Sequence, residues 1–323
     1  DGLLDDILAT RVTDDPVLLA ENRTARGMVR FFQGWFIASE EQLRLAIDAV
    51  PDTVRDTRPP SPWQFPNDPI AFMQVQYGLA LWQRGDLVGF EEHLRRARRR
   101  IEQLPRPYGP FSLAHALTYR GWVLCEIGDF DGAEACTSEL LAIAEQYGFD
   151  FWTLAGTTAD AINRARALLA SGTVDASLLL EQAERLAGTT MLANMIHSRL
   201  LLPYNLTAQA ELLAEVGDHD QALDLFDEAM VVADETGSRY YSAETLRLRA
   251  RTRRALGHPL AIDDLHRAIE LASRQGSIPF ELRARLDLAE LGSRSPRLED
   301  LLAVAAFAAA SGVPSPDLSV PGA

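Results

Sequence analysis

Apolar and small residues recur along this chain with the spacing of one helical face. In six stretches such a residue is followed by a second one four positions later and by a third one seven positions later. Residues at these intervals lie on the same side of an α-helix, so each stretch predicts a helix with one buried face. The six triplets are Ser39-Leu43-Ala46, Phe90-Leu94-Ala97, Ala133-Thr137-Leu140, Ala176-Leu180-Ala183, Ala222-Phe226-Ala229 and Ala261-Leu265-Ala268.

A glycine precedes every triplet by four or five residues and indicates a turn. Glycine at the end of a helix adopts the left-handed conformation that other residues resist. A Gly or Ala stands seven positions before each of these glycines, where a small side chain would let two helices approach closely. The pattern predicts units of helix A, tight turn and helix B, with an aspartate after some of the glycines as the N-cap of helix B. The turn glycines are Gly34, Gly85, Gly128, Gly172, Gly217 and Gly257, at intervals of about 40 to 51 residues.

Stacking of these units defines the expected fold. One hairpin cannot bury its apolar face alone, and a neighbouring hairpin completes the core. The sequence therefore predicts an all-α protein, a right-handed α-solenoid of about six to seven helical hairpins in one domain over residues 1–311. A last hairpin, residues 280–291 and 298–311, lacks the triplet, as a terminal cap would.

Two segments interrupt or follow this array. Residues 51–69 are rich in proline, which accounts for the longest interval between glycines. We expect an extended connection on the surface, with Asp68-Pro69 opening the next helix; a proline-rich docking segment is the alternative. Residues 312–323 are predicted to be a disordered tail.

Charge excludes several function classes. The 323-residue chain has a formal net charge of -15 and contains no lysine. A P-loop, a kinase-type ATP site and a Schiff-base mechanism all need a lysine. The acidic balance also disfavours direct contact with nucleic acid. The arginine run from Arg95 to Arg100 lies among glutamates and predicts a solvated helix face, with a phosphate contact as the alternative.

No arrangement of residues indicates catalysis or metal binding. None of the six histidines belongs to an HExxH or Cys/His motif, and no GxSxG occurs. Cys125 and Cys136 are too few for a disulfide framework and are expected to be small core residues. No apolar run reaches the length of about 18 residues that a membrane span needs. We expect a cytoplasmic protein without cofactor, metal or enzymatic activity.

Residues 212–291 resemble a known class of helical repeat. The stretch LLAEVGDHDQALDLFDEAMVVADETG and the sequence that follows it are similar to tetratricopeptide arrays of bacterial signalling proteins. These are the MalT-like regulators of the LuxR class and related proteins that carry an ATPase or adenylyl-cyclase domain. The resemblance implies sensing of an effector or partner, with ATPase, cyclase or DNA-binding domains of the same parent chain as further partners. The chain itself contains no ATPase motif and no credible helix-turn-helix.

Positions 2, 5 and 9 of each repeat, counted with the turn glycine as position 15, face the groove in tetratricopeptide repeats. This numbering selects an apolar and aromatic start of the groove and a charged end. Aromatic residues and arginine dominate protein recognition, and arginine can bind a carboxylate with two hydrogen bonds. The ligand- or partner-binding residues that we predict are Phe72, His115, Trp122, Arg166, Tyr204, Glu211, Glu244, Arg247 and Arg251; Val75, Leu79, Thr118, Ala159, Ile162 and Thr207 occupy the remaining positions.

The leading hypothesis for function is an interaction and sensor module of a bacterial transcriptional or signalling regulator. A peptide, a small effector or a neighbouring domain would bind the concave face. The alternative is a structural spacer or oligomerisation scaffold of a larger regulator, with no ligand of its own. A hydrolase hidden in the array is the third hypothesis, although no nucleophile, metal or phosphate motif supports it.

Overall fold

The computed structural model describes residues 15–50, 67–172 and 175–291, and these residues form helices joined by short connections. No strand occurs in these ranges. The helices are α2 (Pro16–Phe32), α3 (Phe36–Ala49), α5 (Pro69–Gln83), α6 (Leu87–Ile101), α7 (Tyr108–Glu126), α8 (Phe130–Tyr147), α9 (Asp150–Ala170), α10 (Ala176–Met195), α11 (Leu202–Glu215), α12 (His219–Thr236), α13 (Ser242–Ala255), α14 (Ala261–Gln275) and α15 (Ile278–Leu291).

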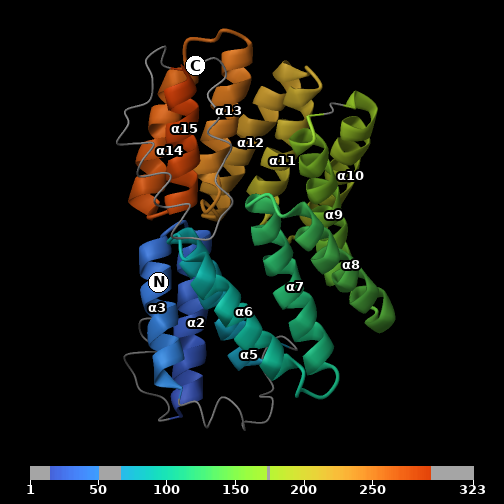
Figure 1. Cartoon of the computed structure of the whole chain (residues 1–323), viewed down its shortest axis with the longest axis vertical. Helices are drawn as coiled ribbons and strands as arrows, with labels where there is room; N and C mark the ends of the chain where they lie inside the picture. The colour runs from blue at the N-terminus through green and yellow to red at the C-terminus, as the bar shows by residue number, and fades with distance from the viewer. Residues whose placement is uncertain (1–14, 51–66, 173–174, 292–323) are drawn as a thin grey trace.

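The helices pair as antiparallel hairpins that stack along the chain (Figure 1). Helices α2 and α3, α5 and α6, α7 and α8, α9 and α10, α11 and α12, and α13 and α14 form the six predicted pairs. The all-α hairpin solenoid is therefore confirmed. The first helix of the additional C-terminal hairpin is confirmed as α15, whereas residues 298–311, 312–323 and most of the proline-rich segment lie outside the described residues.

Each predicted turn glycine has a positive φ. The values run from +64° at Gly257 to +90° at Gly217, in the region where a side chain would be strained. After the glycine, the aspartate caps helix B as expected. The carboxylate of Asp86 accepts the Gly89 N–H at 2.7 Å, and Asp129 and Asp218 bond their own helices in the same way. These local devices explain why the hairpins begin and end where the sequence predicts.

Five of the six triplets are buried in the hairpin cores, and the prediction for α10 was wrong. There Leu180 is 42% exposed, and the buried residues with the same spacing are Leu179, Ala183 and Leu186. The capping residue of α10 is Asp175, three positions after Gly172, whereas in the turns before α6, α8 and α12 the aspartate directly follows the glycine. Leu179 stands four positions after this cap, as the first triplet residue does in α6, α8 and α12. The cap therefore sets the phase of helix B.

The small residues before the turns let helices A and B touch, as predicted. A Cβ atom added at Gly27 would lie 2.5 Å from Leu43 Cγ, which packs across from it on α3. Gly78 of α5 faces Leu94 of α6 in the same way, with 2.9 Å to the nearest side-chain atom. Close packing of this kind leaves no room for a methyl group.

A matched pair of glycine substitutions tests this packing. We expect Gly27→Ala to destabilise the protein by about 1–3 kcal/mol, because the methyl group would overlap Leu43. Gly188→Ala, in the middle of α10 with no atom near the added Cβ, should stabilise by up to about 1 kcal/mol through helix propensity. Urea unfolding followed by circular dichroism measures both changes. Equal effects of the two variants would contradict the close approach at Gly27.

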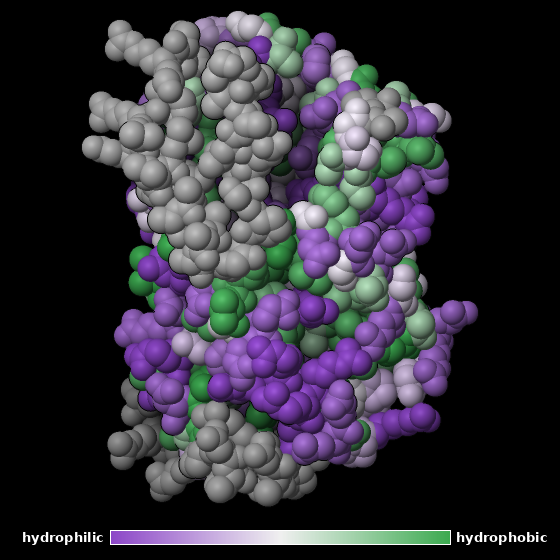
Figure 2. Space-filling view, viewed as in Figure 1, coloured by the Kyte–Doolittle hydropathy of each residue, from purple (hydrophilic) through white to green (hydrophobic). Residues whose placement is uncertain are grey.

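The arginine run forms the outer face of α6, and its surface is hydrophilic in Figure 2. Glu92 pairs with Arg95 and with Arg96, and Arg98 reaches Glu139 at 3.1 Å. The predicted solvated face is confirmed for these arginines. Arg100 differs, because it is buried and its guanidinium lies 2.9 Å from Asp68, the residue that caps α5. Arg100 therefore joins α6 to the start of α5.

The two ends of the array meet, which the sequence did not predict. Figure 1 shows the N-terminal hairpin beneath the C-terminal helices α14 and α15. The Tyr240 N–H donates to the Phe32 carbonyl at 3.0 Å, and the Phe31 and Tyr240 rings stack with centroids 6.2 Å apart. Arg84 at the end of α5 donates to the Gly276 carbonyl at 2.7 Å. We refer to these contacts, together with Trp82 on Phe280, as the closure contact. The superhelix is closed on itself rather than open at both ends.

Candidate functional site

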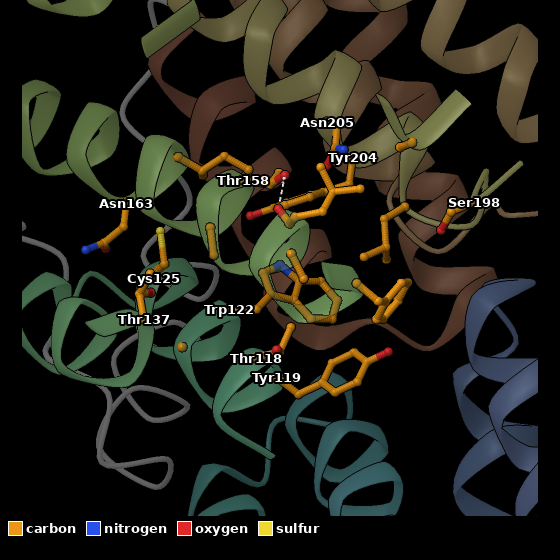
Figure 3. A pocket seen from close by; sticks show the side chains of 18 of the residues that line it. Thr118, Tyr119, Trp122, Cys125, Thr137, Thr158, Asn163, Ser198, Tyr204 and Asn205 are labelled. Carbon is orange, nitrogen blue, oxygen red and sulfur yellow. Dashed lines mark hydrogen bonds between the residues drawn. The ribbon is translucent and has the colours of Figure 1, made fainter. Parts of the chain in front are cut away.

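A pocket of about 100 Å³ opens on the inner wall of the superhelix (Figure 3). Its walls come mainly from α7, α9 and α11, which are the A helices of three consecutive hairpins, and from the segment that joins α10 to α11; Thr137 of α8 and Ala193 of α10 complete them. Tyr240, from the connection between α12 and α13, also lines the pocket. We name this cavity the aromatic pocket; its lining includes Tyr119, Trp122, Phe151, Ile162, Tyr204 and Tyr240.

Trp122 is the central side chain of the aromatic pocket. In Figure 3 it lies between Tyr204 and the Thr118–Tyr119 stretch of its own helix. Its ring contacts Tyr204 edge-on at a centroid distance of 5.8 Å and Tyr240 at 5.6 Å. Edge-to-face pairs of this kind hold aromatic rings in defined positions. The aromatic walls are therefore preformed rather than loosely arranged.

The threonines in the lining contribute methyl groups rather than free hydroxyl donors. Each of the three hydroxyls donates to the carbonyl four residues earlier in its own helix, at 2.9 Å. Such a bond satisfies the hydroxyl within the helix and leaves the rest of the side chain to face outward. The pocket is thus more apolar than its composition suggests. The donors are Thr118, Thr137 and Thr158, and the acceptors are Ala114, Ala133 and Leu154.

Three polar atoms of the lining residues are buried without a partner among the described residues. They are the indole Nε1 of Trp122, the hydroxyl of Tyr240 and the Oδ1 of Asn163. Burial raises the pKa of Tyr240 well above its usual range, so the hydroxyl keeps its proton at neutral pH. None of these atoms has an accessible surface of 1 Å² or more, and Tyr240 is 0% exposed, so they lie behind the pocket wall rather than open into it. The Asn163 amide points away from Trp122 in Figure 3 and donates to the Phe130 carbonyl at 3.1 Å.

A charged compartment adjoins the aromatic pocket, and Cys125 borders both. Its centre is Glu126, whose side chain is 1% exposed and accepts hydrogen bonds from Arg166 at 2.7 Å, Tyr241 at 2.9 Å and Arg283 at 2.8 Å. Arg166 also reaches Glu211 at 3.3 Å. The charges in this compartment thus neutralise one another.

The pKa values agree with ionised groups in the charged compartment. Burial raises the pKa of Glu126, but the guanidinium groups of Arg166 and Arg283 outweigh burial and lower the pKa to about 2. Burial raises the pKa of the nearby Cys125 thiol to about 11, so it stays protonated. A protonated, buried thiol is a poor nucleophile.

Five of the predicted groove positions meet in the aromatic pocket. The register of the A helices selected them correctly, because positions 2, 5 and 9 of three successive helices face the same side. Whether they bind a ligand stays a prediction. The five residues are Thr118, Trp122, Ala159, Ile162 and Tyr204.

The predicted charged residues are less available. Arg166 and Glu211 pair with each other in the charged compartment. Glu244 is buried and forms a two-bond pair with Arg247, which also binds Asp287 at 2.7 Å. Arg251 differs from these four, because it is exposed at the edge of the compartment. The predicted charged end of the groove is therefore filled largely by its own ion pairs.

Phe72 and His115 lie outside the aromatic pocket. Their rings stack on each other with centroids 4.7 Å apart, and His115 is 4% exposed. Burial lowers the pKa of His115 to about 3, so the imidazole is neutral in the folded protein. These two residues pack α5 against α7.

Several lining residues lie outside the predicted groove positions, for two different reasons. Tyr119 stands three positions before Trp122 on the same helix, so a wider helix face would have included it. Tyr240, Ser198 and Asn205 carry no periodic signal. Tyr240 belongs to a Tyr-Tyr pair just before α13, outside positions 2, 5 and 9, and it reaches the pocket from the hairpin that follows α11 and α12.

Other candidate chemistry is limited in the part of the chain that the structure describes. No group of three or more His, Cys, Asp or Glu residues there has the geometry to hold a metal ion. Cys125 and Cys136 are buried and not bonded to each other, as small core residues would be. None of the described helices combines the length and apolar composition needed to cross a bilayer.

The fold is similar to those of known helical repeat proteins. No family model matches the chain. The structure is similar to that of a Rap protein complexed with competence and sporulation factor, with a TM-score of 0.66 and 13% identity over 97% of this chain and 81% of that one. It is also similar to a signal-transduction ATPase with a tetratricopeptide repeat sensor from Pyrococcus horikoshii, with a TM-score of 0.51 and 9% identity. The fold is tetratricopeptide-like.

The similar proteins are matched over different shares of their lengths. The match to the ATPase covers 96% of this chain and 46% of that protein. A curated relative, the uncharacterized protein R02095 of Rhizobium meliloti, is 37% identical over 93 residues. Those residues are 28% of this chain and only 9% of the relative. The narrower resemblance to MalT-like regulators stays a prediction.

Proposed function

We propose that this chain is the sensor module of a bacterial signalling regulator and binds an effector in the aromatic pocket. The observation that carries the proposal is a preformed aromatic cavity on the inner wall, built by the A helices of three consecutive hairpins. Concave, mostly apolar cavities with a few polar groups are the usual form of ligand sites. A spacer without a ligand has no need of such a cavity.

The folds of similar proteins support a regulatory role. The Rap structure was solved with competence and sporulation factor, and the archaeal ATPase carries its tetratricopeptide repeats as a sensor. Fold alone does not determine function, so the proposal depends on the pocket of this chain.

Binding rather than catalysis fits the chemistry of the pocket. Among the described residues that line it there is no carboxylate and no histidine to serve as a general base. Its one thiol, that of Cys125, has a pKa raised to about 11. A nucleophile and a base within hydrogen-bonding distance are the minimum for covalent catalysis.

The pocket is connected to the closure contact, which suggests how binding is transmitted. The Trp122 ring packs edge-on against Phe31 and Trp82, with centroid distances of 6.3 Å and 5.2 Å. Both of these residues belong to the closure contact. Tyr240 lines the pocket and bonds Phe32. A ligand that contacts Trp122 would therefore favour the closed superhelix over an open one.

The proposal predicts stabilisation by an effector that a filled pocket abolishes. We expect a fraction of an extract from the producing cells to raise the melting temperature of the wild type, because a ligand of the folded state stabilises it. Ala159→Phe should abolish the increase by placing a ring in the pocket. Ala187→Phe, an exposed position on α10 outside the pocket, is the matched control and should keep the increase.

Differential scanning fluorimetry with extract fractions of different molecular mass measures these changes. An increase that survives in Ala159→Phe would contradict the assignment of the site. If no fraction changes the melting temperature of the wild type, the sensor proposal is wrong and a scaffold role takes its place.

A further inference from the structure

The outer face of the last turns of α10 is apolar and exposed. Met191, Leu192 and Met195 are 60%, 48% and 68% exposed, and Ile196, directly after the helix, is exposed as well. Met195 follows the other two by four and three positions, so the three side chains lie on one face of the helix. An apolar face with this spacing is normally buried against a neighbouring element. We name these four residues the α10 patch.

The surroundings of the α10 patch are uncharged. Residues 186–198 contain no Asp, Glu, Arg or Lys, although 24% of the chain is charged. Contiguous apolar surface of this kind marks interaction sites in proteins that are otherwise hydrophilic outside. Methionine is common on such surfaces, because its flexible side chain adapts to the shape of a partner. The patch is therefore a candidate docking surface.

The α10 patch is independent of the aromatic pocket. Helix α10 packs against α9 and α11 and lies at the outer edge of the array, at the right of Figure 1. In these last turns Ala193 is buried and lines the aromatic pocket, whereas none of the four patch residues does. The patch thus faces away from the pocket, where a second macromolecule can approach.

The sizes of the side chains make this face complementary to itself. Residues 187–188 are alanine and glycine, whereas 191–192 and 195–196, the next two turns, consist of methionine, leucine and isoleucine. A two-fold axis at the middle turn aligns α10 antiparallel with α10 of a second copy. The small turn of each copy then lies opposite the large last turn of the other. Such self-complementarity is what a two-fold dimer requires.

The charges also fit an antiparallel pair of copies. Two chains with a net charge of -15 repel each other, so they can meet only where the contact itself has no like charges. The axis places the exposed Glu184 of one copy toward Arg199 of the other, because both are equally far along the chain from the middle turn. The side chain of Arg199 keeps 39% of its surface exposed beside Glu235. Opposite charges therefore flank the uncharged centre.

We propose that this chain forms a two-fold dimer in which the α10 patches of two copies pack antiparallel. The dimer goes beyond the proposed sensor function, which needs only the aromatic pocket of one copy. A contact between two short helix faces is small compared with a standard protein interface. We therefore expect a dissociation constant in the micromolar range.

Sedimentation equilibrium of the whole chain measures the dimer. We expect a monomer at about 1 µM and mostly dimer at about 500 µM, as a micromolar dissociation constant implies. Met195→Glu should weaken the dimer at least about 100-fold, because each copy would bring an unpaired carboxylate into an apolar contact.

Val88→Glu is the matched control. Val88 is 64% exposed on α6, far along the chain from α10, and the substitution adds the same negative charge. It should leave the dissociation constant unchanged. Melting temperatures show that both variants fold, since both substitutions are at exposed positions.

An exchange of charges tests the antiparallel arrangement. Glu184→Arg should weaken the dimer about 5-fold, because it places like charges at both ends of the contact. Addition of Arg199→Glu in the same chain should restore the affinity, since opposite charges then face each other again.

The outcomes are separate from those for the aromatic pocket. A monomer at every concentration, or equal weakening by Met195→Glu and Val88→Glu, overturns the dimer through the α10 patch. Failure of the double variant to recover affinity overturns the antiparallel arrangement. The extract experiment with Ala159→Phe can succeed or fail in each case, because the patch residues do not line the pocket.

Discussion

Replacement of Glu126 by Gln is expected to lower the free energy of unfolding by about 3–5 kcal/mol. Its carboxylate is 1% exposed and receives hydrogen bonds from Arg166, Tyr241 and Arg283. The glutamine has the same shape but no charge, so it leaves buried guanidinium groups with less compensation. Removal of one partner from a buried ion pair is among the most destabilising single changes known for a protein interior.

A surface glutamate provides the control for this substitution. Glu139 pairs with Arg98 at 3.1 Å, but its side chain is 40% exposed. Glu139→Gln should change the stability by less than about 1 kcal/mol, because exposed ion pairs contribute little. Urea unfolding at pH 7 compares the two variants. A loss in Glu126→Gln as small as that in Glu139→Gln would show that the network is not buried in solution.

The stabilising effect of Glu126 is expected to depend on pH. The pKa of Glu126 is lowered to about 2 in the folded protein, whereas an unfolded glutamate titrates near its model value of 4.5. The ionised carboxylate therefore stabilises the fold above about pH 5, and this contribution is lost as the pH falls toward 2. The stability difference between wild type and Glu126→Gln should shrink over this range. A constant difference would mean that Glu126 is not the group that titrates.

Replacement of Phe31 by Ala is expected to destabilise the protein by about 3–5 kcal/mol and to separate its two ends. Phe31 is fully buried and contacts Tyr240, Trp122 and Phe36. Its ring lies in the closure contact, so the cavity left by the substitution weakens the link between the first and last hairpins. The hydrogen bond from the Tyr240 N–H to Phe32 should then open more often.

Phe226→Ala is the control that distinguishes a loss of the closure contact from a general loss of stability. Phe226 is also fully buried, but it lies in the core of the α11–α12 hairpin rather than in the closure contact. Both variants should lose similar stability in urea. Hydrogen exchange at the Tyr240 amide should distinguish the two variants at the same urea concentration. Phe31→Ala should lose the protection of this amide, and Phe226→Ala should keep it. Equal protection in both would indicate that the ends are held by contacts other than Phe31.

The sequence was sufficient for features that depend on neighbouring residues. Turn glycines at positive φ, aspartate caps and small residues at helix contacts act within one hairpin, so Gly85, Asp86 and Gly78 could be interpreted from their spacing alone. The inner face of each A helix follows from the same local geometry. This is why Trp122 and Tyr204 were placed correctly on the groove side.

In α10, the buried face could not be predicted from the spacing after the turn glycine. The repeat was counted from Gly172, but the helix is capped by Asp175, and the buried face moved to Leu179 and Leu186. The buried triplet begins at Leu179 rather than at Ala176, and three residues add about 300° of rotation, so the buried face turns by about 60° and Ala183 stays in it. A pattern counted from the glycine could not show this change.

Only the tertiary structure determined the closure contact and what it creates. The ends meet because small rotations between successive hairpins accumulate over the whole array, and no single repeat contains that sum. Packing of hairpins that are far apart in the sequence brings Arg283 of α15 to Glu126 of α7, and it brings Tyr240 against Phe32. The neighbouring helix α15 engages Glu244 and Arg247 in ion pairs through Arg283 and Asp287, although their helix positions face the groove. Local spacing thus determined which side of each helix faces inward, and long-range packing determined which of those side chains remain available to a ligand.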